Sequence, residues 1–390
     1  MGKETYTGDV AFEVRGHLGI ITLNRPKAMN SLTQLMCESV LIQLQDWAED
    51  DDVAQVLVRG AGERGLCAGG DIVGVYRDML AHRDADGGEL LPSGTPGYQA
   101  QYETEAFWAT EYEMNLTIAE YPKPYIALMD GLALGGGLGI SAHGSHRIVT
   151  ERTRAGMPEV TIGFSPDVGG TYLLARAPGQ LGLHAGLQGA HLGAADAIHL
   201  GLADAHVDSE AIGALITDLV ESSVDEVLPR YATAPEPSGL AAAASWIDEA
   251  YAAADVPGII ARLEEIAAAA ERSGAESAAA GSPAGGTSAS VDAAAAAAAL
   301  RTKSPTSLAV AHRAIVEARD FALDEVLKRE YTVGMHMLRS ADFREGIRAQ
   351  VIDKDRDPQW NPATSEQVDR GLVDAYFTLV QSKQLELPAP

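Results

Sequence analysis

The sequence has few cysteines and few basic residues. Only two of its 390 residues are cysteines, Cys37 and Cys67, and two cysteines provide neither a disulfide framework nor a cysteine-based metal site. So few cysteines suit a reducing compartment. Lys and Arg number 29 against 55 Asp and Glu, which gives a formal net charge of −26. Because this charge repels phosphate backbones, we expect no nucleic-acid partner.

The sequence also has no long apolar run and no targeting signal at its start. No segment contains the roughly 18 consecutive apolar residues that a membrane span requires, so we expect no membrane association. Residues 1–8 (MGKETYTG) lack the apolar stretch of a secretory signal and the Arg-rich pattern of a transit peptide. We therefore expect a cytoplasmic protein, whose 46% hydrophobic residues suffice for a core.

Residues 1–210 alternate between strand-like and helix-like patterns. Four short apolar runs indicate strands: Gly19–Asn24, Val53–Gly60, Pro124–Gly131 and His146–Glu151. A helix is predicted to begin at Ser31, because Gln34 follows three residues later as in a capping box. Strands that alternate with helices favour an α/β fold with a parallel or mixed sheet.

The composition changes after residue 210. Residues 211–302 are rich in Ala, Gly and Ser, and we predict a segment that is partly helical and partly mobile, with low complexity over Ser273–Ser290. Residues 303–390 recover a helical pattern. We predict two amphipathic helices there, Ser307–Arg319 and Leu323–Arg339, followed by a charged, Pro-rich tail.

Two glycine-bearing segments offer backbone N–H groups to a ligand. They are LCAGGDI (Leu66–Ile72) and GLALGGGLGI (Gly131–Ile140), and each follows a predicted strand. Glycine lets a ligand approach the backbone, and two N–H groups from such turns can hold one carbonyl oxygen as an oxyanion hole. The alternative is that both segments are tight strand-to-helix connections. Neither contains the dinucleotide fingerprint GxGxxG or a phosphate loop.

Two carboxylates lie close together in MPEVTIGFSPDVGG (Met157–Gly170). Glu159 and Asp167 are eight residues apart, among apolar residues, glycines and prolines. A carboxyl group in an apolar pocket has a raised pKa, which suits general acid–base catalysis. The alternative is that Glu159 and Asp167 each cap a helix.

Other reactive side chains fit packing better than catalysis. Cys67 borders the first glycine turn, but no matching His–Cys pattern accompanies it, so we do not expect it to be a nucleophile. His143 follows the second glycine segment and is expected to be a packed, hydrogen-bonded histidine. The ten histidines show no metal-binding spacing, so we predict no metal site.

Four segments in order resemble the enoyl-CoA hydratase/isomerase (crotonase) family: LNRPKAMNSL, GLCAGGDI, KPYIALMDGLALGGGLGIS and MPEVTIGFSPDVGGTYLLAR. Within this family, PDVGG and the tail after residue 303 resemble the 3-hydroxyisobutyryl-CoA hydrolases. The resemblance covers about residues 10–210 and 303–363. It implies a crotonase-like spiral of ββα turns with a C-terminal helical region, and it makes residues 1–210 an acyl-CoA-binding catalytic core.

The resemblance also implies roles for individual residues. The N–H groups of Gly70 and Gly136 would hold the thioester carbonyl oxygen. Further residues would bind the substrate: Ala68 against the adenine, Arg25 and Lys27 near the nucleotide end, and Asp71, Ile72 and Glu111 elsewhere in the site. A plain solvated position is the alternative for Arg25, Lys27 and Glu111.

The carboxylates separate the branches of the family. Hydratases use two glutamates, of which the first falls here at Gly139, which has no side chain, and the second at Glu159. The hydrolase pattern instead pairs Glu159 with Asp167. The resemblance therefore implies hydrolysis of a short branched β-hydroxyacyl-CoA thioester, 3-hydroxyisobutyryl-CoA, a reaction of valine breakdown. An enoyl-CoA hydratase or isomerase and a non-catalytic acyl-CoA-binding protein are the alternatives.

The same resemblance bears on cofactors and assembly. We expect no cofactor, because the thioester is already activated and an oxyanion hole supplies the main stabilisation. Family members often form trimers through their C-terminal helices, so a homo-oligomer, trimer or hexamer, is one expectation. The alternative is a tail that folds back on its own subunit.

Overall fold

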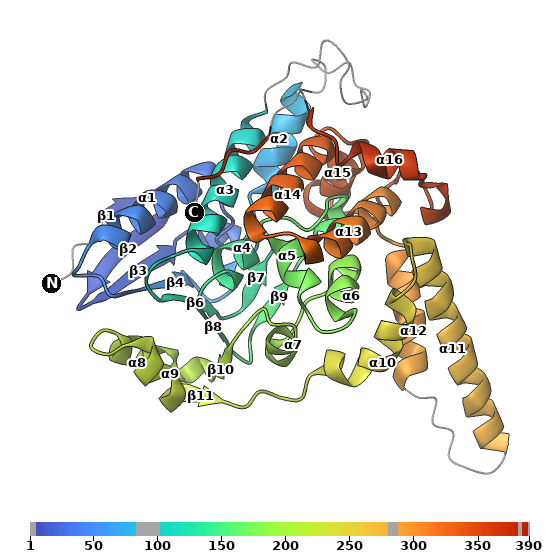
Figure 1. The fold of residues 1–390 in the computed structure, drawn as a ribbon, viewed down its shortest axis with the longest axis horizontal. Coiled ribbons are helices and arrows are strands. Elements are labelled where there is room, and N and C mark those ends of the chain that lie inside the picture. Colours follow the sequence, from blue (N-terminus) through green and yellow to red (C-terminus); the bar gives the residue numbers. More distant parts are fainter. Residues whose placement is uncertain (1–4, 83–101, 280–287, 381–383, 389–390) are drawn as a thin grey trace.

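The computed structural model describes residues 5–82, 102–279, 288–380 and 384–388, and within these residues the fold contains two sheets (Figure 1). The strands are β1 (Thr5–Thr7), β2 (Val10–Arg15), β3 (Leu18–Leu23), β4 (Gln55–Gly60), β5 (Gly65–Cys67), β6 (Tyr125–Met129), β7 (Leu132–Leu134), β8 (His146–Val149), β9 (Arg154–Gly156), β10 (Ala205–Val207) and β11 (Ala232–Thr233). The larger sheet has the order β1-β2-β3-β4-β6-β8-β10-β11, and the smaller has the order β5-β7-β9.

Successive strands spiral between the two sheets. Each turn of the spiral places one strand in the larger sheet and the next in the smaller: β4 then β5, β6 then β7, and β8 then β9. A helix or helical turn follows each pair: α2 (Ile72–His82), α4 (Gly136–Ala142) and the 3₁₀ turn η2 (Glu159–Ile162). From β3 to β10 the strands of the larger sheet pair in parallel, as do those of the smaller sheet. The predicted spiral of ββα turns and its four strands are confirmed.

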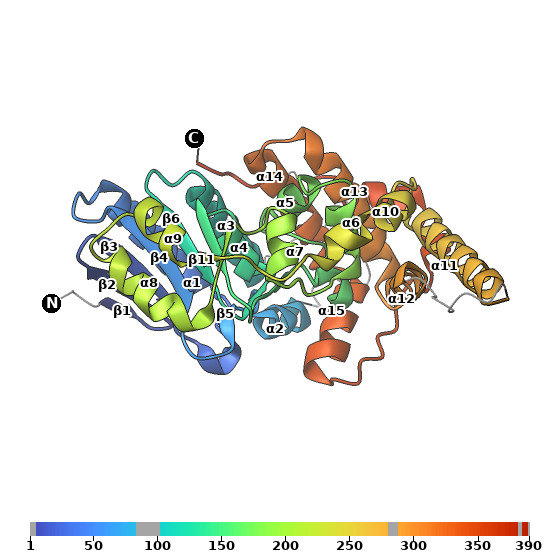
Figure 2. The same cartoon turned by 90° about the horizontal axis from the view of Figure 1, so that it is seen from below.

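Helices cover both faces of the larger sheet, which explains why its central strands are apolar throughout. On one face lie α8 (Ile212–Leu219) and α9 (Val224–Tyr231), as Figure 2 shows. On the other face the main core includes α1 (Gln34–Glu49) and α3 (Glu103–Ala119). Residues 212–233 thus pack on the sheet of the first predicted region, and the division of the chain at residue 210 stays a prediction.

The predicted start of the first helix is wrong. α1 begins at Gln34, and its N-cap is Thr33, whose hydroxyl accepts the Met36 N–H at 3.4 Å. The two preceding residues are held in extended backbone by other partners. Arg25 donates to the Ser31 carbonyl at 2.7 Å, and Leu32 pairs with the segment around Gly70. These long-range contacts exclude a capping box at Ser31.

The remaining helices form a second layer and an arm. They are α5 (Gly170–Ala175), α6 (Leu181–Gln188), α7 (Ala194–His199), α10 (Gly239–Tyr251), α11 (Val256–Ala279), α12 (Ser288–Leu300), α13 (Pro305–Glu317), α14 (Leu323–Met337), α15 (Ala341–Ile347) and α16 (Arg370–Ala375). The short turns are η1 (Pro26–Ala28), η3 (Ser209–Ala211), η4 (Ala318–Asp320), η5 (Arg348–Ile352) and η6 (Ser365–Gln367). α13 and α14 confirm the two predicted C-terminal helices.

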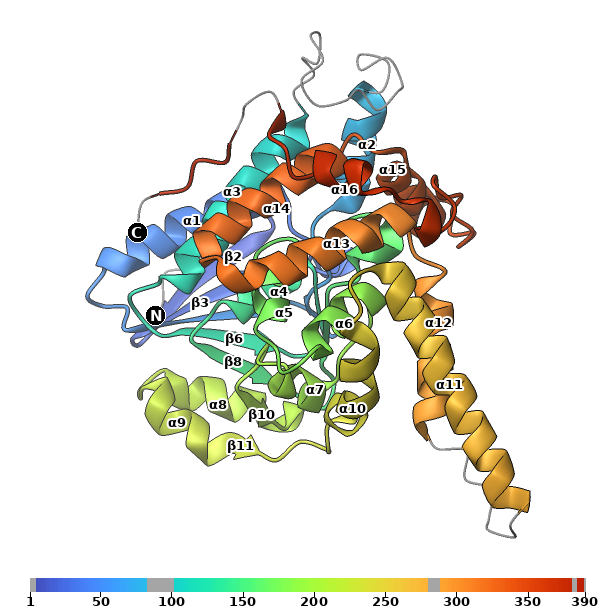
Figure 3. The same cartoon turned by 45° about the vertical axis from the view of Figure 1, so that its right-hand side comes forward.

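α11 and α12 lie side by side and project away from the sheets, as Figure 1 and Figure 3 show. Together with α10, these helices confirm that the segment after residue 210 is helical in part. The low-complexity stretch Ser273–Ser290 was also predicted to be mobile. Residues 280–287 and the side chains of this stretch lie outside the described residues, so its mobility stays a prediction.

The C-terminal helices pack against their own chain. α13 contacts α5 and α6, α14 contacts α3 and α5, and α15 contacts η2. This is the arrangement expected of a tail that folds back, while a homo-oligomer stays a prediction. Within the described ranges, no helix is both long enough and apolar enough to cross a bilayer.

A test of this fold is the attachment of α8 and α9 to the sheet. The buried Gln55 of β4 donates to the carbonyls of Leu219 and Ser222, at 2.8 and 2.9 Å, and accepts the Val224 N–H at 2.9 Å. We expect Gln55→Ala to lower the free energy of unfolding by about 1–3 kcal/mol, because buried backbone groups lose their partners. Hydrogen exchange should rise across residues 212–231. Gln45→Ala, on the exposed side of α1, should change neither quantity, and an unaltered exchange pattern in Gln55→Ala would contradict this role.

Candidate active site

One cavity of about 680 Å³ collects nearly all of the predicted site residues. It lies where the glycine turns after β5 and β7 meet η2, α3 and the C-terminal segment. The predicted residues that line it are Lys27, Ala68, Gly70, Asp71, Ile72, Glu111, Gly136, Glu159 and Asp167. The fold therefore brings predicted residues that are up to 140 residues apart (167 − 27) into one cavity, and their roles stay predictions.

The two predicted oxyanion donors lie next to each other. Gly136 is the first residue of α4, and a Cβ atom placed on it would lie 3.4 Å from the Gly70 nitrogen. Leu32 fixes the Gly70 turn from both sides, since its N–H donates to Gly69 at 2.9 Å and its carbonyl accepts the Asp71 N–H at 2.8 Å. In the part of the chain that the structure describes, no hydrogen bond uses the N–H of Gly70 or of Gly136. Both donors are therefore available to one carbonyl oxygen.

Glu111 faces this pair of donors from α3. Its side chain is 2% exposed, and its Oε1 would lie 2.5 Å from a Cβ atom on Gly136. Among the described residues, Oε1 has no hydrogen-bond partner. Burial, followed by repulsion from Asp167, raises the pKa of Glu111 well above its ordinary value. The solvated surface position considered for Glu111 is excluded.

Glu159 opens η2 and also points a free oxygen into the cavity. It is 7% exposed, and its Oε2 has no partner among the described residues. The turn is preceded by Pro158, and no side chain caps it. Burial first, and then the Asp167 carboxyl, raises the pKa of Glu159 well above its ordinary value. Glu159 is thus a buried carboxyl in a cavity and not a helix cap, and a catalytic role for it stays a prediction.

Asp167 is 8% exposed and accepts a hydrogen bond from the Tyr112 hydroxyl at 2.8 Å. Burial raises the pKa of Asp167 to about 7, although the bond from Tyr112 opposes this shift. The N-cap of the following helix α5 is Gly169, so the prediction of Asp167 as a cap is wrong. Glu330 of α14 occupies that role instead, because it accepts the N–H groups of Gly169 and Thr171 at 2.7 and 2.9 Å.

The position of the missing hydratase glutamate is closed. A Cβ atom on Gly139 would lie 2.8 Å from Cβ of Val168 and 2.9 Å from Nδ2 of Asn115. Both distances are shorter than an ordinary van der Waals contact, so this site has no room for a longer side chain.

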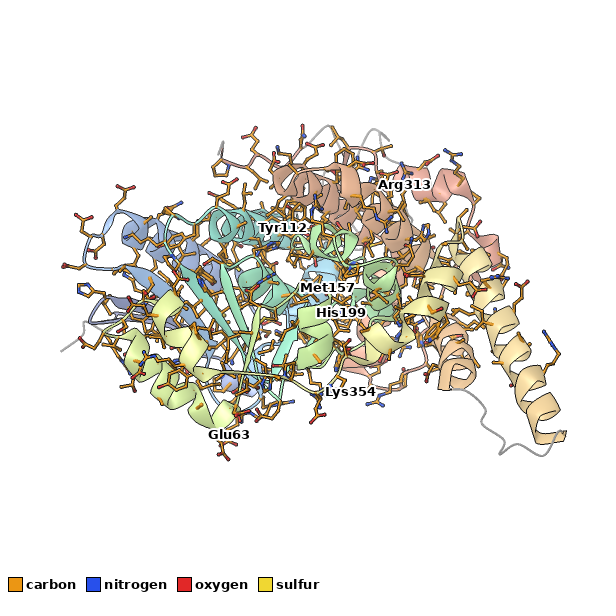
Figure 4. All side chains as sticks on the ribbon, turned by 60° about the horizontal axis from the view of Figure 1, so that its bottom comes forward. Glu63, Tyr112, Met157, His199, Arg313 and Lys354 are labelled. Carbon is orange, nitrogen blue, oxygen red and sulfur yellow. The ribbon has the colours of Figure 1, made fainter. Side chains whose placement is uncertain are left out.

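Two cationic side chains line the cavity. Lys27 was predicted, and Lys354, which follows η5 in the C-terminal segment, was not. Figure 4 labels Lys354 in the C-terminal segment. Arg25 is not among the lining residues. Its guanidinium instead pairs with Asp71 at 3.0 Å and Asp9 at 3.3 Å, so a direct contact with a nucleotide stays a prediction.

Three residues at or next to the cavity were not predicted from the sequence: Tyr112, Glu330 and Lys354. Glu330 had a usable signal, because it falls on the apolar face of its helix with Val326, Leu327 and Tyr331. A glutamate in such a stripe indicates a buried polar contact. Lys354 gave no such signal, since it lies in a charged segment whose return to the cavity depends on the tertiary fold.

The residues assigned to packing behave as predicted. Cys67 is buried, and burial raises the pKa of its thiol to about 12, which leaves no thiolate for nucleophilic attack. His143 contacts the Val168 carbonyl through Nε2 at 2.8 Å. Outside the cavity, Glu151, His206 and Asp208 bring three potential metal ligands within 4.8 Å of one another. Glu151 and Asp208 are exposed, and Glu151 already accepts both the N–H and the hydroxyl of Ser209.

Comparison with known proteins gives the family. The enoyl-CoA hydratase/isomerase family matches residues 18–377. The chain belongs to this family. Two relatives carry the name 3-hydroxyisobutyryl-CoA hydrolase, mitochondrial. The one from Danio rerio is 36% identical over 97% of this chain and 92% of that protein, and the one from Homo sapiens is 32% identical over 99% and 93%.

Solved structures of family members share the complete fold, including the C-terminal helical region. A carnitinyl-CoA dehydratase from Mycobacterium thermoresistibile has a TM-score of 0.83 and 42% identity, over 98% of this chain and all of that one (100%). An enoyl-CoA hydratase from Rhodobacter sphaeroides 2.4.1 has a TM-score of 0.81 and 34% identity, over 97% and 100%. The names of these relatives span hydrolysis, dehydration and hydration.

The oxyanion donors can be tested by a single methyl group. In Gly136→Ala, the Cβ atom enters the space between the Gly70 nitrogen and Glu111, where the two predicted donors would hold a carbonyl oxygen. We expect turnover to fall about 10²–10³-fold, as for loss of one oxyanion donor. Gly213→Ala is the matched control, since a Cβ atom there meets nothing within 4 Å. Normal turnover by a folded Gly136→Ala protein would place the donors elsewhere.

The raised pKa of Asp167 predicts a pH-dependent stability. A carboxyl whose pKa is higher in the folded state binds protons more tightly when folded. Its contribution is complete below its ordinary pKa of 3.8 and is lost as the pH rises through about 7. In Asp167→Asn the side chain has no ionisable group, but its amide oxygen still accepts the hydrogen bond from the Tyr112 hydroxyl. Between about pH 5 and pH 8, the stability of Asp167→Asn relative to the unsubstituted protein should rise by on the order of 2 kcal/mol. Thermal unfolding of both proteins across this pH range measures the difference between their free energies of unfolding. A difference that stays constant with pH would contradict the raised pKa of Asp167.

Proposed function

We propose that this protein hydrolyses a short branched β-hydroxyacyl-CoA thioester, 3-hydroxyisobutyryl-CoA, to the free acid and CoA. The observation that carries the proposal is the pair of buried carboxyls, Glu159 and Asp167, which share one cavity with the N–H groups of Gly70 and Gly136. The closed surroundings of Gly139 also leave no room for a second hydratase glutamate. The hydrolase names of relatives that match nearly the whole chain support it. Valine breakdown would be the metabolic setting.

The reaction begins with the thioester carbonyl. The N–H groups of Gly70 and Gly136 donate to its oxygen and stabilise the negative charge that develops there. Glu159 then either removes a proton from a water molecule that attacks the carbonyl carbon, or attacks that carbon itself to form an anhydride that water hydrolyses. In both routes the carbon–sulfur bond breaks, and the sulfur of CoA leaves with a proton. Both routes require an ionised Glu159.

Asp167 and Glu111 supply the acidic partners. Burial raises the pKa of Asp167 to about 7, so Asp167 is partly protonated near neutral pH and can return a proton to the leaving sulfur. Burial also raises the pKa of Glu111, which lines the same cavity and is the other candidate for this step. Asp167 is also placed to hold the β-hydroxyl of the acyl chain. For the CoA moiety, Ala68 would contact the adenine, while Lys27 and Lys354 attract phosphate groups on a protein whose net charge is −26. Asp71 and Ile72 complete this wall, and Arg25 orients Asp71.

Some expectations from the sequence stay predictions alongside this function. No resident metal or cofactor is needed for the steps above. A trimer or hexamer through the C-terminal helices is consistent with the family but is not required by a site assembled within one chain. The expected cytoplasmic location also stays a prediction, and the names of the curated relatives place those proteins in mitochondria.

A second function is favoured by one observation, the 42% identity to a carnitinyl-CoA dehydratase. Dehydration and its reverse, hydration, need a carboxylate on each side of the transferred water. Gly139 and its closed surroundings argue against the arrangement that two-glutamate hydratases use. Glu111 is the remaining buried carboxyl that could serve instead, so this reaction is included in the test.

The experiment compares cleavage of the thioester bond with addition or removal of water in a panel of acyl-CoA esters. Thiol release is measured with 3-hydroxyisobutyryl-CoA and other acyl-CoA esters, and hydration or dehydration is measured with crotonyl-CoA and carnitinyl-CoA. We expect thiol release from the β-hydroxyacyl ester to exceed the other reactions widely. Glu159→Gln should lower turnover by at least about 10²–10⁴-fold with little change in substrate binding. Glu249→Gln, on the exposed side of α10, is the matched control. Fast dehydration of carnitinyl-CoA without thiol release would contradict the hydrolase proposal and support the dehydratase function.

A further inference from the structure

The turn that carries Asp167 has an unfavourable backbone conformation. Val168, the next residue, has a φ of 53°, although it is neither glycine nor a small polar residue. A β-branched residue in the left-handed region is strained, and such a conformation persists only where neighbouring groups enforce it. The direction of the Asp167 carboxyl therefore depends on the contacts that hold Val168 and Gly169.

Two side chains hold this turn, the half-buried His143 and the buried Glu330. His143, at the end of α4, contacts the Val168 carbonyl through Nε2 at 2.8 Å. Burial lowers the pKa of His143 to about 4, so the ring is neutral, and Nε2 must carry its proton to donate this bond. Glu330 of α14 accepts the Gly169 N–H through Oε2 at 2.7 Å, and through Oε1 it accepts the N–H and the hydroxyl of Thr171 at 2.9 and 2.5 Å.

Glu330 is a buried carboxyl that accepts hydrogen bonds from the turn and lies among other titratable groups. It is 5% exposed, and its three accepted hydrogen bonds join the strained turn to a helix about 160 residues further along the chain. The titratable groups that face Glu330 from other elements are Tyr112 on α3, Glu159 on η2 and Asp167 on the turn, while His143 contacts the same turn through the Val168 carbonyl. Its charged or titratable sequence neighbours on α14 are Arg329 and Tyr331. Arg329 is paired with Glu317.

We propose that Glu330 is a positioning residue for the reaction, which fixes the strained Asp167–Gly169 turn and adds a negative charge behind the catalytic carboxyls when it ionises. The proposal rests on the hydrolase function proposed above. It assigns to α14 a direct influence on the chemistry, although Glu330 lines a space behind Asp167 and does not line the substrate cavity.

The proposal predicts separate effects on geometry and charge. Glu330→Gln keeps the size of the side chain but presents an amide NH₂ to one of three donors, so the turn loosens. We expect kcat to fall about 10- to 100-fold while KM changes little, because the turn orients a carboxyl and leaves the CoA contacts intact. Burial raises the pKa of Glu330 to about 8, so this carboxyl becomes charged only as the pH approaches and passes 8. Glu330→Gln should therefore change the kcat/KM profile around pH 8, where the ionisation of Glu330 is lost, and leave the profile well below pH 7 unaltered.

Three further variants make the result specific. Glu330→Asp retains an ionisable carboxyl on a shorter side chain, so it should lower kcat but leave the profile around pH 8 close to that of the unsubstituted protein. Thr171→Val removes only the hydroxyl bond and should have a smaller effect on kcat with no shift in pH. Tyr251→Phe removes a buried hydrogen bond to Gln188 in a distant part of the core and should lower the melting temperature without altering either kinetic quantity.

The outcomes distinguish this inference from the proposed function. If the unsubstituted protein releases no thiol from any acyl-CoA, the proposed function fails, and the Glu330 variants are then compared in whichever reaction it does catalyse. If the unsubstituted protein is active but Glu330→Gln only lowers the melting temperature, with kcat and the pH profile unchanged, Glu330 is a structural helix cap and the inference is overturned. If Glu330→Gln does not fold, a normal kcat in both Glu330→Asp and Thr171→Val overturns it equally.

Discussion

The burial of several carboxyl groups around one cavity is the constraint on which this site depends. Glu111, Glu159 and Asp167 lie in it and Glu330 lies behind it, and in each case burial is the largest cause of the raised pKa. A buried charge without compensation is costly, so such groups retain protons at a pH where free carboxyls have lost them. Protonated and ionised members can then coexist near neutral pH, and one residue type supplies both the acid and the base.

This constraint explains why the C-terminal helices pack on the core. A carboxyl cluster stays buried only if something covers it, and the ββα spiral alone leaves η2 and the Asp167 turn open on one side. α14 closes the turn with Glu330, and α15 packs so closely on η2 that a Cβ atom on Gly346 would lie 2.2 Å from the Ile162 carbonyl. Lys303 adds a hydrogen bond to Thr161 at 2.8 Å. The regions that composition separates therefore meet at the site.

The sequence predicted the parts of the site that depend on local signals. Gly70, Gly136, Glu159 and Asp167 lie in short motifs next to strands, and the order of strands and helices placed these motifs at one edge of the fold. The start of α1 differs from the prediction because Arg25 contacts the Ser31 carbonyl and Leu32 pairs with the Gly70 turn, and this second contact spans 38 residues of chain (70 − 32).

Residues that act across long sequence separations were the hardest to predict. Glu330 was recognisable as an anomaly on an apolar helix face, but its partners, Gly169 and Thr171, are about 160 residues away. Lys354 reaches the cavity only because the segment after α15 folds back over it. No local pattern encodes either pairing, since each depends on how α14 and α15 dock on the spiral.

The strained turn links the two features that separate this chain from a two-glutamate hydratase. The turn presents Asp167 to the cavity, and the same backbone conformation directs the Val168 side chain against Gly139, at the position that a second glutamate would need. Restoring a glutamate at residue 139 would therefore require the Val168 turn to move, and that movement would displace Asp167. One backbone conformation, which His143 and Glu330 hold in place, thus presents Asp167 to the cavity and fills the space beside Gly139.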